Sequence, residues 1–380
     1  MGTAGLRFCR SPDAQLRKAE DLCVSYVPLL PRKLNGMAPK IRDLSRREYE
    51  AWDSFVLARP AGTFFHKAGW REVIEAAFRH KSHYILAEQD GSVTGVLPLF
   101  HIRSLLFGNR LVSVPFCVYG GPLAVDDATA QALRNSAIDL MNRVGANLIE
   151  FRLRNAEAFD WVTRSDLYAT FRKELHSEPE QNLKAIPRKQ RAVVRKAIGL
   201  GLQASFSRDV TGFYRLYSES VRNLGTPVFS QRYLQLLIDK FREDTEILTV
   251  TEQEKTVASV LSFFFRDEVI PYYGAGKPRA RDLGAFDFMY WQVMNHAASA
   301  RDSRIFDFGR SKVGTGPFAF KKNWGFTPQP LHYAYWLTRG HQIPNNNPLN
   351  PKYKIFIENW KRLPLPIANR VGPFIARGIG

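Results

Sequence analysis

Two stretches of the sequence, about 160 residues apart, repeat the same order of predicted structure. Each stretch has two alternating strands around a turn, an aromatic-glycine segment, a helical segment and a short apolar strand. These features lie at residues 84–100, 119–122 and 148–153 in the first copy, and at 247–264, 272–276 and 305–308 in the second. A repeat of this period indicates duplicated domains, because the units of solenoid proteins are far shorter.

The two copies differ after their last predicted strand. The first copy continues into polar sequence, whereas the second continues into a basic, glycine-containing segment at residues 309–325. This asymmetry predicts that one copy kept the chemistry.

The length supports two domains, since 380 residues exceed one comfortable core. Residues 1–36 show no sustained period and no signal-peptide pattern, and are predicted to be a disordered extension. We expect a first domain over residues 37–180, a second over 181–340 and a basic tail over 341–380.

Positive charge is concentrated in three segments. The formal net charge is +18, and residues 184–202, 301–325 and 339–380 contribute +6, +4 and +6. Such concentration predicts a polyanionic partner, namely the phosphates of a nucleotide or coenzyme, RNA, or an anionic membrane surface.

Cysteine and histidine patterns indicate neither a disulfide framework nor a metal site. The three cysteines form no CxxC pair and the eight histidines include no HExxH motif, which is typical of a reducing compartment. The strongest apolar run, residues 111–125, is too short for a membrane span and contains two prolines. We therefore expect a cytoplasmic protein without a bound metal.

Periodicity predicts the same element order in both halves. In the first half we expect helices at 45–57, 70–78 and 128–143, and strands at 84–88, 92–101, 111–119 and 148–153. In the second half we expect helices at 188–199, 212–224, 231–242 and 284–300, and strands at 203–207, 247–251, 257–265, 268–273 and 305–308. A strand, two helices, an antiparallel meander, a helix and a strand is the order of the GNAT acyltransferase fold. The predicted fold class is layered α/β, with two tandem GNAT-like domains and mostly antiparallel mixed sheets.

The order of several motifs resembles the FemAB family of tandem-GNAT peptidyl- and acyltransferases, in the branch associated with exosortase/PEP-CTERM exopolysaccharide loci. The matching segments are Thr63-Phe-Phe-His66 with Trp70, and residues 95–99, 118–122, 186–191, 225–229, 306–325 and 360–366. The resemblance covers the chain from about residue 40 to the end. No sustained heptad pattern corresponds to the coiled-coil arm that some family members carry.

The resemblance implies an N-acyltransferase of the cell envelope or exopolysaccharide pathway, with the active cleft between two domains. The co-substrate would be an acyl-CoA or an aminoacyl donor, with no permanently bound cofactor. The acceptor would be an amine on a small-molecule or lipid-linked precursor. The alternatives are a non-catalytic module that binds a phosphorylated polymer or RNA, and a tRNA-dependent aminoacyltransferase, for which a tRNA partner is less favoured.

Three residues are candidates for catalysis. By resemblance, the Fem-type motif falls on Asp307, Phe320, Lys321 and Trp324, and Lys321 would polarise the acyl carbonyl or the leaving group. The alternative interpretation is that Lys321 is an ordinary exposed lysine on a surface helix. His66 and Asp307 are candidates for proton transfer, with a structural histidine and a solvent-facing aspartate as the alternatives.

Two basic segments are candidates for binding the donor or other phosphates. The segment after the last strand offers Arg310, Ser311, Lys312, Gly314, Thr315 and Gly316, which form either an anion-binding loop or a tight turn. On the predicted helix at 188–199, Arg188, Arg191 and Arg195 lie on one side. That helix either binds phosphate or is a solvated linker.

Aromatic and glycine residues are candidates for the acceptor pocket, with core packing as the alternative. They are Trp70, Tyr119, Gly120, Tyr272, Tyr273, Phe320 and Trp324. The tail mixes basic and aromatic residues, which suits either peripheral contact with the anionic inner membrane or a wrap over the first domain.

Overall fold

Two tight hairpins form the centres of two separate sheets. Strands β2 (Lys81–Gln89) and β3 (Ser92–Ser104) pair in the first sheet, and β10 (Thr245–Glu252) and β11 (Lys255–Phe265) pair in the second. Both turns have two residues with positive φ, which is the geometry of the type I′ hairpin turn. These are Asp90 and Gly91 in the first turn, and Gln253 and Glu254 in the second.

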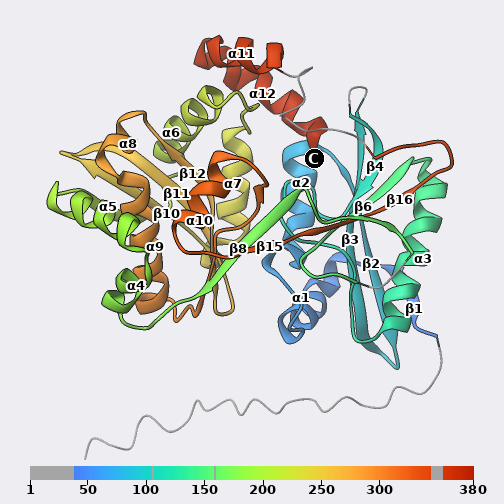
Figure 1. Cartoon of the computed structure of the whole chain (residues 1–380). Helices are drawn as coiled ribbons and strands as arrows, with labels where there is room; N and C mark the ends of the chain where they lie inside the picture. Colours follow the sequence, from blue (N-terminus) through green and yellow to red (C-terminus); the bar gives the residue numbers. More distant parts are fainter. Residues whose placement is uncertain (1–37, 105–106, 158–159, 344–353) are drawn as a thin grey trace, which may run out of the picture. The chain divides into compact units, whose positions relative to one another are not determined.

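The structure is a computed structural model that describes residues 38–104, 107–157, 160–343 and 354–380. The predicted extension at residues 1–36 lies outside the described residues. Each sheet has eight strands (Figure 1). The first has the order β1-β2-β3-β4-β6-β16-β7 with β5 beside β3, and the second the order β14-β8-β13-β12-β11-β10-β9 with β15 beside β8.

The remaining strands complete the two sheets. In the first sheet they are β1 (Lys40–Asp43), β4 (Gly108–Val112), β5 (Leu123–Ala124), β6 (Leu148–Leu153), β7 (Val162–Arg164) and β16 (His332–Leu337). In the second sheet they are β8 (Tyr168–Glu174), β9 (Gln203–Ser207), β12 (Glu268–Gly276), β13 (Ile305–Asp307), β14 (Ser311–Lys312) and β15 (Pro328–Pro330). All neighbouring pairs are antiparallel except β4 with β6 and β12 with β13.

The helices follow the strands in the same order in both copies. The first copy has α1 (Tyr49–Ala58), α2 (Gly69–Phe78) and α3 (Asp127–Val144), with short 3-10 turns at Arg46–Glu48 and Phe64–His66. The second has α4 (Pro179–Ala185), α5 (Arg188–Gly199), α6 (Val210–Asn223), α7 (Gln231–Lys240), α8 (Arg279–Leu283), α9 (Ala285–Ala300) and α10 (Gly316–Asn323), with a 3-10 turn at Arg242–Asp244. The order strand, two helices, three-stranded meander, helix and parallel strand therefore occurs twice, which confirms the predicted fold class.

The two sheets exchange strands across the predicted boundary at residues 180/181. Strand β8 precedes this boundary but pairs with β13 in the second sheet, and β16 follows the second copy but pairs with β6 in the first. Local periodicity cannot reveal such pairing, because it joins segments far apart in the sequence. The division into domains at this point stays a prediction.

The strand expected at residues 111–119 is wrong beyond Val112, where β4 ends. Pro115 cannot donate to a strand ladder, and both Val114 and Phe116 have positive φ, at 46° and 67°. A β-branched residue in this region is a marked backbone outlier. The segment therefore forms a loop that carries Cys117 and Tyr119 beside the second sheet.

The tail forms two helices, α11 (Lys354–Arg362) and α12 (Leu365–Ile379). The Trp360 indole donates to the Thr226 carbonyl at 3.0 Å, next to α6. The His80 ring contacts the Arg377 carbonyl at 2.9 Å, beside the start of β2. The described part of the tail therefore packs on both copies.

Candidate functional site

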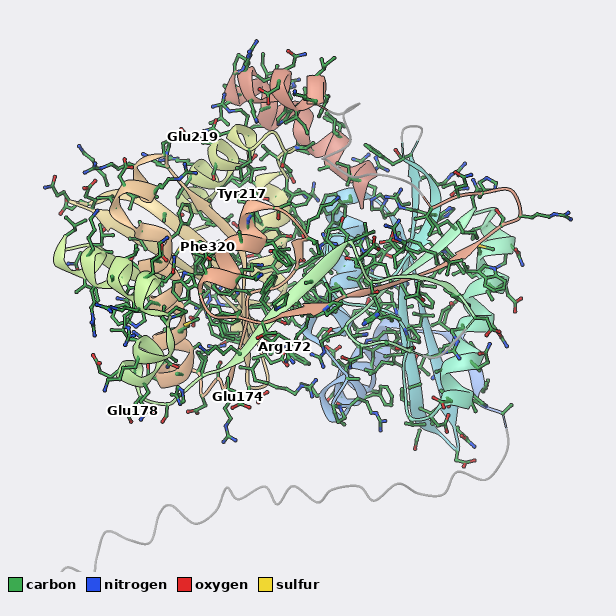
Figure 2. The ribbon with its side chains drawn as sticks, viewed as in Figure 1. Arg172, Glu174, Glu178, Tyr217, Glu219 and Phe320 are labelled. Carbon is green, nitrogen blue, oxygen red and sulfur yellow. The ribbon has the colours of Figure 1, made fainter. Side chains whose placement is uncertain are left out.

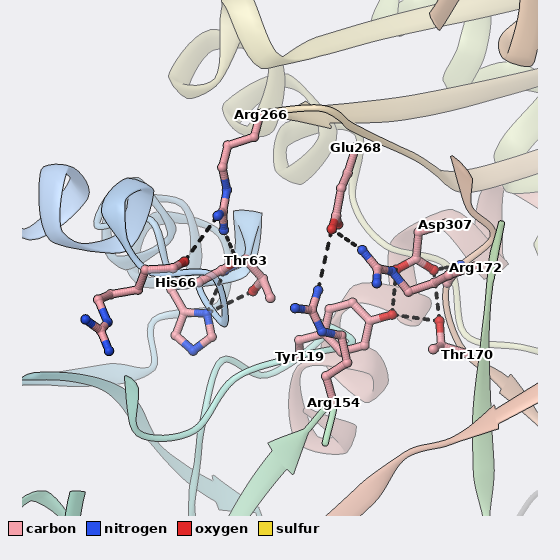
Figure 3. A network of polar contacts seen from close by, with 12 residues as sticks. Thr63, His66, Tyr119, Arg154, Thr170, Arg172, Arg266, Glu268 and Asp307 are labelled. Carbon is pink, nitrogen blue, oxygen red and sulfur yellow. Dashed lines mark hydrogen bonds and ion pairs between the residues drawn. The ribbon is translucent and has the colours of Figure 1, made fainter. Parts of the chain in front are cut away.

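The last strand of the second copy ends in a fully buried carboxylate. Asp307, in β13, is 0% exposed. Its Oδ1 accepts from the Thr170 hydroxyl at 2.8 Å and from the Gly309 backbone N–H at 2.7 Å. Its Oδ2 accepts from the Tyr119 hydroxyl at 2.6 Å (Figure 3). Residues from both copies thus converge on one carboxylate.

Tyr119 holds its proton firmly in this environment. Burial raises the pKa of Tyr119 well above its usual value, and the negative charge of Asp307 raises it further. The hydroxyl also lies 2.6 Å from the Thr170 hydroxyl. Tyr119 is therefore a fixed hydrogen-bond donor to Asp307.

Two arginines and a glutamate extend this cluster towards solvent. Arg172 lies on β8 (Figure 2). Its Nε lies 3.4 Å from Asp307 Oδ2, and its guanidinium forms an ion pair with Glu268 (Figure 3). Arg154 Nη1, just after β6, lies 3.6 Å from Glu268 Oε1. The side chains of Arg154, Arg172 and Glu268 are 16%, 19% and 15% exposed, in contrast to Asp307. These three residues are the part of the cluster that solvent can reach.

The cluster keeps spare hydrogen-bonding capacity. Among the described residues, Arg154 Nη1 and Arg172 Nε are buried and have no hydrogen-bond acceptor, although both make the ion-pair contacts given above. Burial raises the pKa of Glu268, while the charges of Arg172 and Arg154 act in the opposite direction. A ligand that accepts from these two donors would offset part of the cost of burying them.

Lys321 lies in α10 and is 9% exposed. Its ammonium donates to the carbonyls of Phe308, Gly309 and Arg310, at 2.7, 2.9 and 3.3 Å. Burial lowers the pKa of Lys321 to about 7, with Asp307 raising it and Arg310 lowering it. Lys321 therefore holds in place the loop that follows Asp307, since its three N–H groups match three carbonyls.

His66 is buried and lies at the end of a 3-10 turn. Its Nδ1 lies 2.8 Å from the Thr63 hydroxyl and 3.3 Å from the Thr63 backbone nitrogen, so the ring closes the turn locally. Burial lowers the pKa of His66 to about 4, against a hydrogen bond with the Gly121 backbone that raises it. The ring is neutral at pH 7, and these contacts favour the structural interpretation over proton transfer.

The segment after β13 is tied into the second sheet. Ser311 and Lys312 form β14, which pairs with Ala169 and Tyr168 of β8. The Thr315 hydroxyl donates to the Lys312 carbonyl at 2.7 Å. Gly314 takes a positive φ of 80° in the turn, and Gly316 begins α10. These contacts are typical of a tight turn, and phosphate binding at this segment stays a prediction.

Arg310 joins the two sheets. Its Nη1 donates to the Tyr333 hydroxyl of β16 at 2.6 Å, and its guanidinium lies over the Tyr168 ring at 4.7 Å. The other predicted phosphate ligands lie on α5, which packs on α9 through Val194 and Ala197. On α5, Arg188 and Arg195 are exposed and Arg191 is partly exposed. Within the described residues, none of the three forms a hydrogen bond or ion pair with the Asp307 cluster.

The predicted acceptor residues lie mostly in the two hydrophobic cores. Trp70, Tyr119 and Tyr272 surround Phe65, with ring centroids 5.7, 5.9 and 5.3 Å away. Tyr273 meets Tyr233 at 2.9 Å between hydroxyls. The other predicted members lie elsewhere: Gly120 packs against Ser113, and Phe320 and Trp324 lie in the second core. Their role as an acceptor pocket stays a prediction.

Periodicity would have found some of the residues that the sequence analysis missed. Strand β8 alternates as Tyr-Ala-Thr-Phe-Arg-Lys-Glu, and Thr170 and Arg172 are two residues apart, so they share one face. Arg154 and Glu268 give no such signal, because each follows or begins an ordinary strand. Only their pairing in space makes them stand out.

The second copy matches a known domain family. Residues 183–322 match the family model "Acetyltransferase (GNAT) domain". This part of the chain is therefore similar to a GNAT acetyltransferase domain. No curated protein matches the sequence.

Solved structures share the architecture of both copies. FemX is similar at a TM-score of 0.61 and 16% identity, covering 84% of this chain and 100% of its own. A conserved protein of unknown function from Bacteroides thetaiotaomicron is similar at a TM-score of 0.53 and 10% identity, and the likeness covers 79% of this chain and 100% of that protein. The C-terminal domain of a proposed lysylphosphatidylglycerol synthetase from Agrobacterium fabrum is similar at a TM-score of 0.50 and 12% identity, and the likeness covers 76% of this chain and 91% of that domain. At these identities the likeness shows a common fold.

Proposed function

We propose that this protein is an N-acyltransferase that transfers an acyl or aminoacyl group to an amine of a cell-envelope or exopolysaccharide precursor. The observation that carries the proposal is the cluster of Arg154, Arg172 and Glu268 next to buried Asp307, where two copies of an acyltransferase fold meet. Acyl transfer needs a proton acceptor for the amine and donors for the developing oxyanion. The cluster offers both within one network.

The partly exposed guanidinium groups of Arg154 and Arg172 are the proposed oxyanion donors. As the amine nitrogen bonds to the acyl carbon, the carbonyl oxygen gains negative charge, and fixed donors in a partly buried site stabilise it. Asp307 fixes Arg172 from behind through its Oδ2, and Tyr119 and Thr170 fix Asp307. This support keeps the donors in place before substrate arrives.

Glu268 is the proposed proton acceptor. Burial raises its pKa, which makes it a better base than an exposed carboxylate. In the proposed step the C–N bond forms, the bond from the acyl carbon to the thiol or hydroxyl leaving group breaks, and Glu268 takes the amine proton. Glu268 then returns this proton, through solvent, to the thiolate or alkoxide leaving group, which balances the reaction and restores the carboxylate.

Lys321 is proposed as a positioning residue for the loop at residues 308–310, since its three N–H groups are already bonded to backbone carbonyls. The donor is proposed to be an acyl-CoA or an aminoacyl ester or thioester. Its phosphates would bind the basic segments at 310–316 and on α5, whose charge suits them. Proton transfer by His66 and an acceptor pocket formed by the predicted aromatic and glycine residues stay hypotheses.

The proposed setting is the cytoplasmic side of the envelope, in the exosortase-associated branch of FemAB-like enzymes. The resemblance of motifs supports this setting, as does the shared fold with FemX and with a protein named for joining lysine to phosphatidylglycerol. Among the described residues no helix is long and apolar enough to cross a membrane.

Glu268→Gln separates catalysis from binding. With acetyl-CoA as donor and glucosamine as a soluble amine probe, release of free thiol reports turnover and calorimetry reports acetyl-CoA affinity. We expect turnover to fall about 10²–10⁴-fold, the usual share of a general base, with acetyl-CoA affinity nearly unchanged.

The matched control is Glu150→Gln in the first copy. Glu150 also pairs with a buried arginine, Arg152, at 2.8 Å and is equally exposed at 15%. Its loss should leave turnover within about twofold of wild type, since no step uses it. Full turnover in Glu268→Gln, or equal loss in both variants, would reject Glu268 as the base. Binding of acetyl-CoA or RNA without any thiol release would favour the binding module instead.

A further inference from the structure

The tail helices α11 and α12 present large apolar side chains to solvent. Phe374 is 77% exposed, Ile355 76%, Ile367 47%, Phe356 42% and Val371 40%. Leu224, just after α6, is 71% exposed, and the neighbouring Gly225 packs against Ile357 of α11. These residues, which we call the tail apolar face, are a large share of all exposed large hydrophobic residues in the described chain.

Helix α12 turns its small residues, not its large ones, towards the protein. Its buried positions are Ala368, Gly372 and Ala376, four residues apart on one side. A Cβ at Gly372 would lie 2.7 Å from the Val228 backbone nitrogen, so the helix packs closely against the second copy. A surface helix normally buries its large apolar side chains, and this one reverses the pattern. The reversal indicates a second apolar environment outside the molecule.

Hydrogen bonds hold this face in a fixed position. Arg222 Nη1 donates to the Leu363 carbonyl at 2.8 Å, between the two helices. Trp360 is tied to Thr226, and the far end of α12 is tied to His80. The tail apolar face is therefore a built surface and is ready before any partner binds.

The charge of the two helices selects the partner. Residues 354–380 contain five basic residues, Lys354, Lys361, Arg362, Arg370 and Arg377, and one acidic residue, Glu358. Lys354, Arg362, Arg370 and Arg377 are exposed. Pairing two copies of the chain through this face would bring two strongly positive surfaces together. Phosphate headgroups above an acyl layer satisfy both the charge and the apolar residues.

We propose that the tail apolar face docks this protein on an anionic phospholipid surface, with α11 and α12 lying in the headgroup layer. The proposal gives a structural basis to the envelope setting proposed above. It does not depend on the acyl-transfer step, because none of its residues belongs to the Asp307 cluster.

Vesicle sedimentation with the full chain tests the proposal. Wild type should sediment with vesicles that contain phosphatidylglycerol, and much less with vesicles of phosphatidylcholine alone, and added salt should weaken the binding. Phe374→Ser with Ile355→Ser should lower the affinity at least about tenfold, since both side chains would leave the apolar layer. Arg362→Gln with Arg370→Gln should lower it by a few-fold and reduce the salt dependence.

Matched substitutions elsewhere control for general loss of apolar or positive surface. Leu57→Ser removes a side chain that is 48% exposed in α1, and Lys189→Gln removes an exposed charge from α5. Both should bind vesicles as wild type does, and thermal melting should confirm that every variant folds. Thiol release with the soluble amine should be unchanged in the tail variants, which separates this proposal from the catalytic one.

Three results would overturn the proposal. One is wild type that does not sediment with phosphatidylglycerol vesicles. Another is loss of binding in Leu57→Ser as large as in the double serine variant. The third is a concentration-dependent dimer that the double serine variant abolishes, which would make this face a contact between copies of the chain.

Discussion

Each of the two sheets carries an arginine paired with a glutamate, but the two guanidinium groups have different sets of partners. In the first copy, Arg152 of β6 donates from Nε to Glu150, from Nη1 to the Cys117 carbonyl at 3.0 Å, and from Nη2 to Gly380 at 2.7 Å. In the second copy, Arg172 beside β13 keeps a buried Nε without a hydrogen-bond acceptor among the described residues. The first arginine is saturated, and the second keeps capacity for a ligand.

This difference shows how two similar sheets of a duplicated fold can hold charge pairs with different roles. A saturated buried charge pair holds the structure together and gains nothing from a substrate. A charge pair with an unsatisfied hydrogen-bond donor lowers stability, and such pairs are typical of sites that bind a ligand. We therefore expect the Arg152 pair to support the structure and the Arg172 pair to belong to the proposed site.

Asp307→Ala against Glu150→Ala tests this division with the largest expected effect. Asp307→Ala leaves the Tyr119 and Thr170 hydroxyls and the Gly309 N–H without their shared acceptor, and removes an ion-pair partner of Arg172. We therefore expect a loss of about 3–5 kcal/mol in the free energy of unfolding. Glu150→Ala should cost about 1–2 kcal/mol, because Arg152 keeps two carbonyl acceptors. Urea unfolding measures both. Equal losses would remove the proposed contrast between the copies.

Tyr119→Phe against Tyr273→Phe tests whether the network, and not burial alone, supports turnover. Each change removes one buried hydroxyl, and each should cost about 1–2 kcal/mol of stability. Only Tyr119 contacts Asp307, whereas Tyr273 contacts Tyr233. We therefore expect thiol release to fall about tenfold or more in Tyr119→Phe and to stay near wild type in Tyr273→Phe. Similar turnover in the two variants would argue against a catalytic network at Asp307.

Lys321→Met tests the buried amine through the pH dependence of the free energy of unfolding. Because the folded pKa of about 7 is below the ordinary 10.5, the folded state binds fewer protons than the unfolded state between these values. The stability that Lys321 contributes therefore rises with pH across this window and is lost as pH falls through about 7. Relative to Lys321→Met, wild type should gain up to about 1.4 kcal/mol per pH unit. Urea unfolding at several pH values measures the difference, and parallel pH profiles would show that the amine keeps an ordinary pKa.

Periodic and turn signals were enough for the repeated elements. The hairpins around Asp90-Gly91 and around residues 253–254 form as predicted, because alternation and turn chemistry act over a few residues. The extent of the third strand was wrong, since Pro115 and two residues with positive φ replace its second half by a loop. That loop carries Tyr119, so the wrongly predicted part of the strand contributes a residue to the candidate site.

The resemblance to the Fem-type motif pointed to Asp307 and Lys321, and Lys321 also lies in the segment that differs between the copies. It gave no sign of what they contact. Arg172 comes from β8, Glu268 from the first residue of β12, and Arg154 from the end of the first copy. Each looks like an ordinary charged residue at the end of a strand.

By itself, the sequence determined the duplicated mixed α/β architecture, the hairpins and the positive charge, because these depend on local spacing and composition. Only the tertiary structure decided that β8 and β16 exchange between sheets, that Lys321 serves three carbonyls, and that the tail shows its large apolar side chains to solvent. The physical reason is that a pairing between distant segments, and the desolvation that comes with it, has no period along the chain.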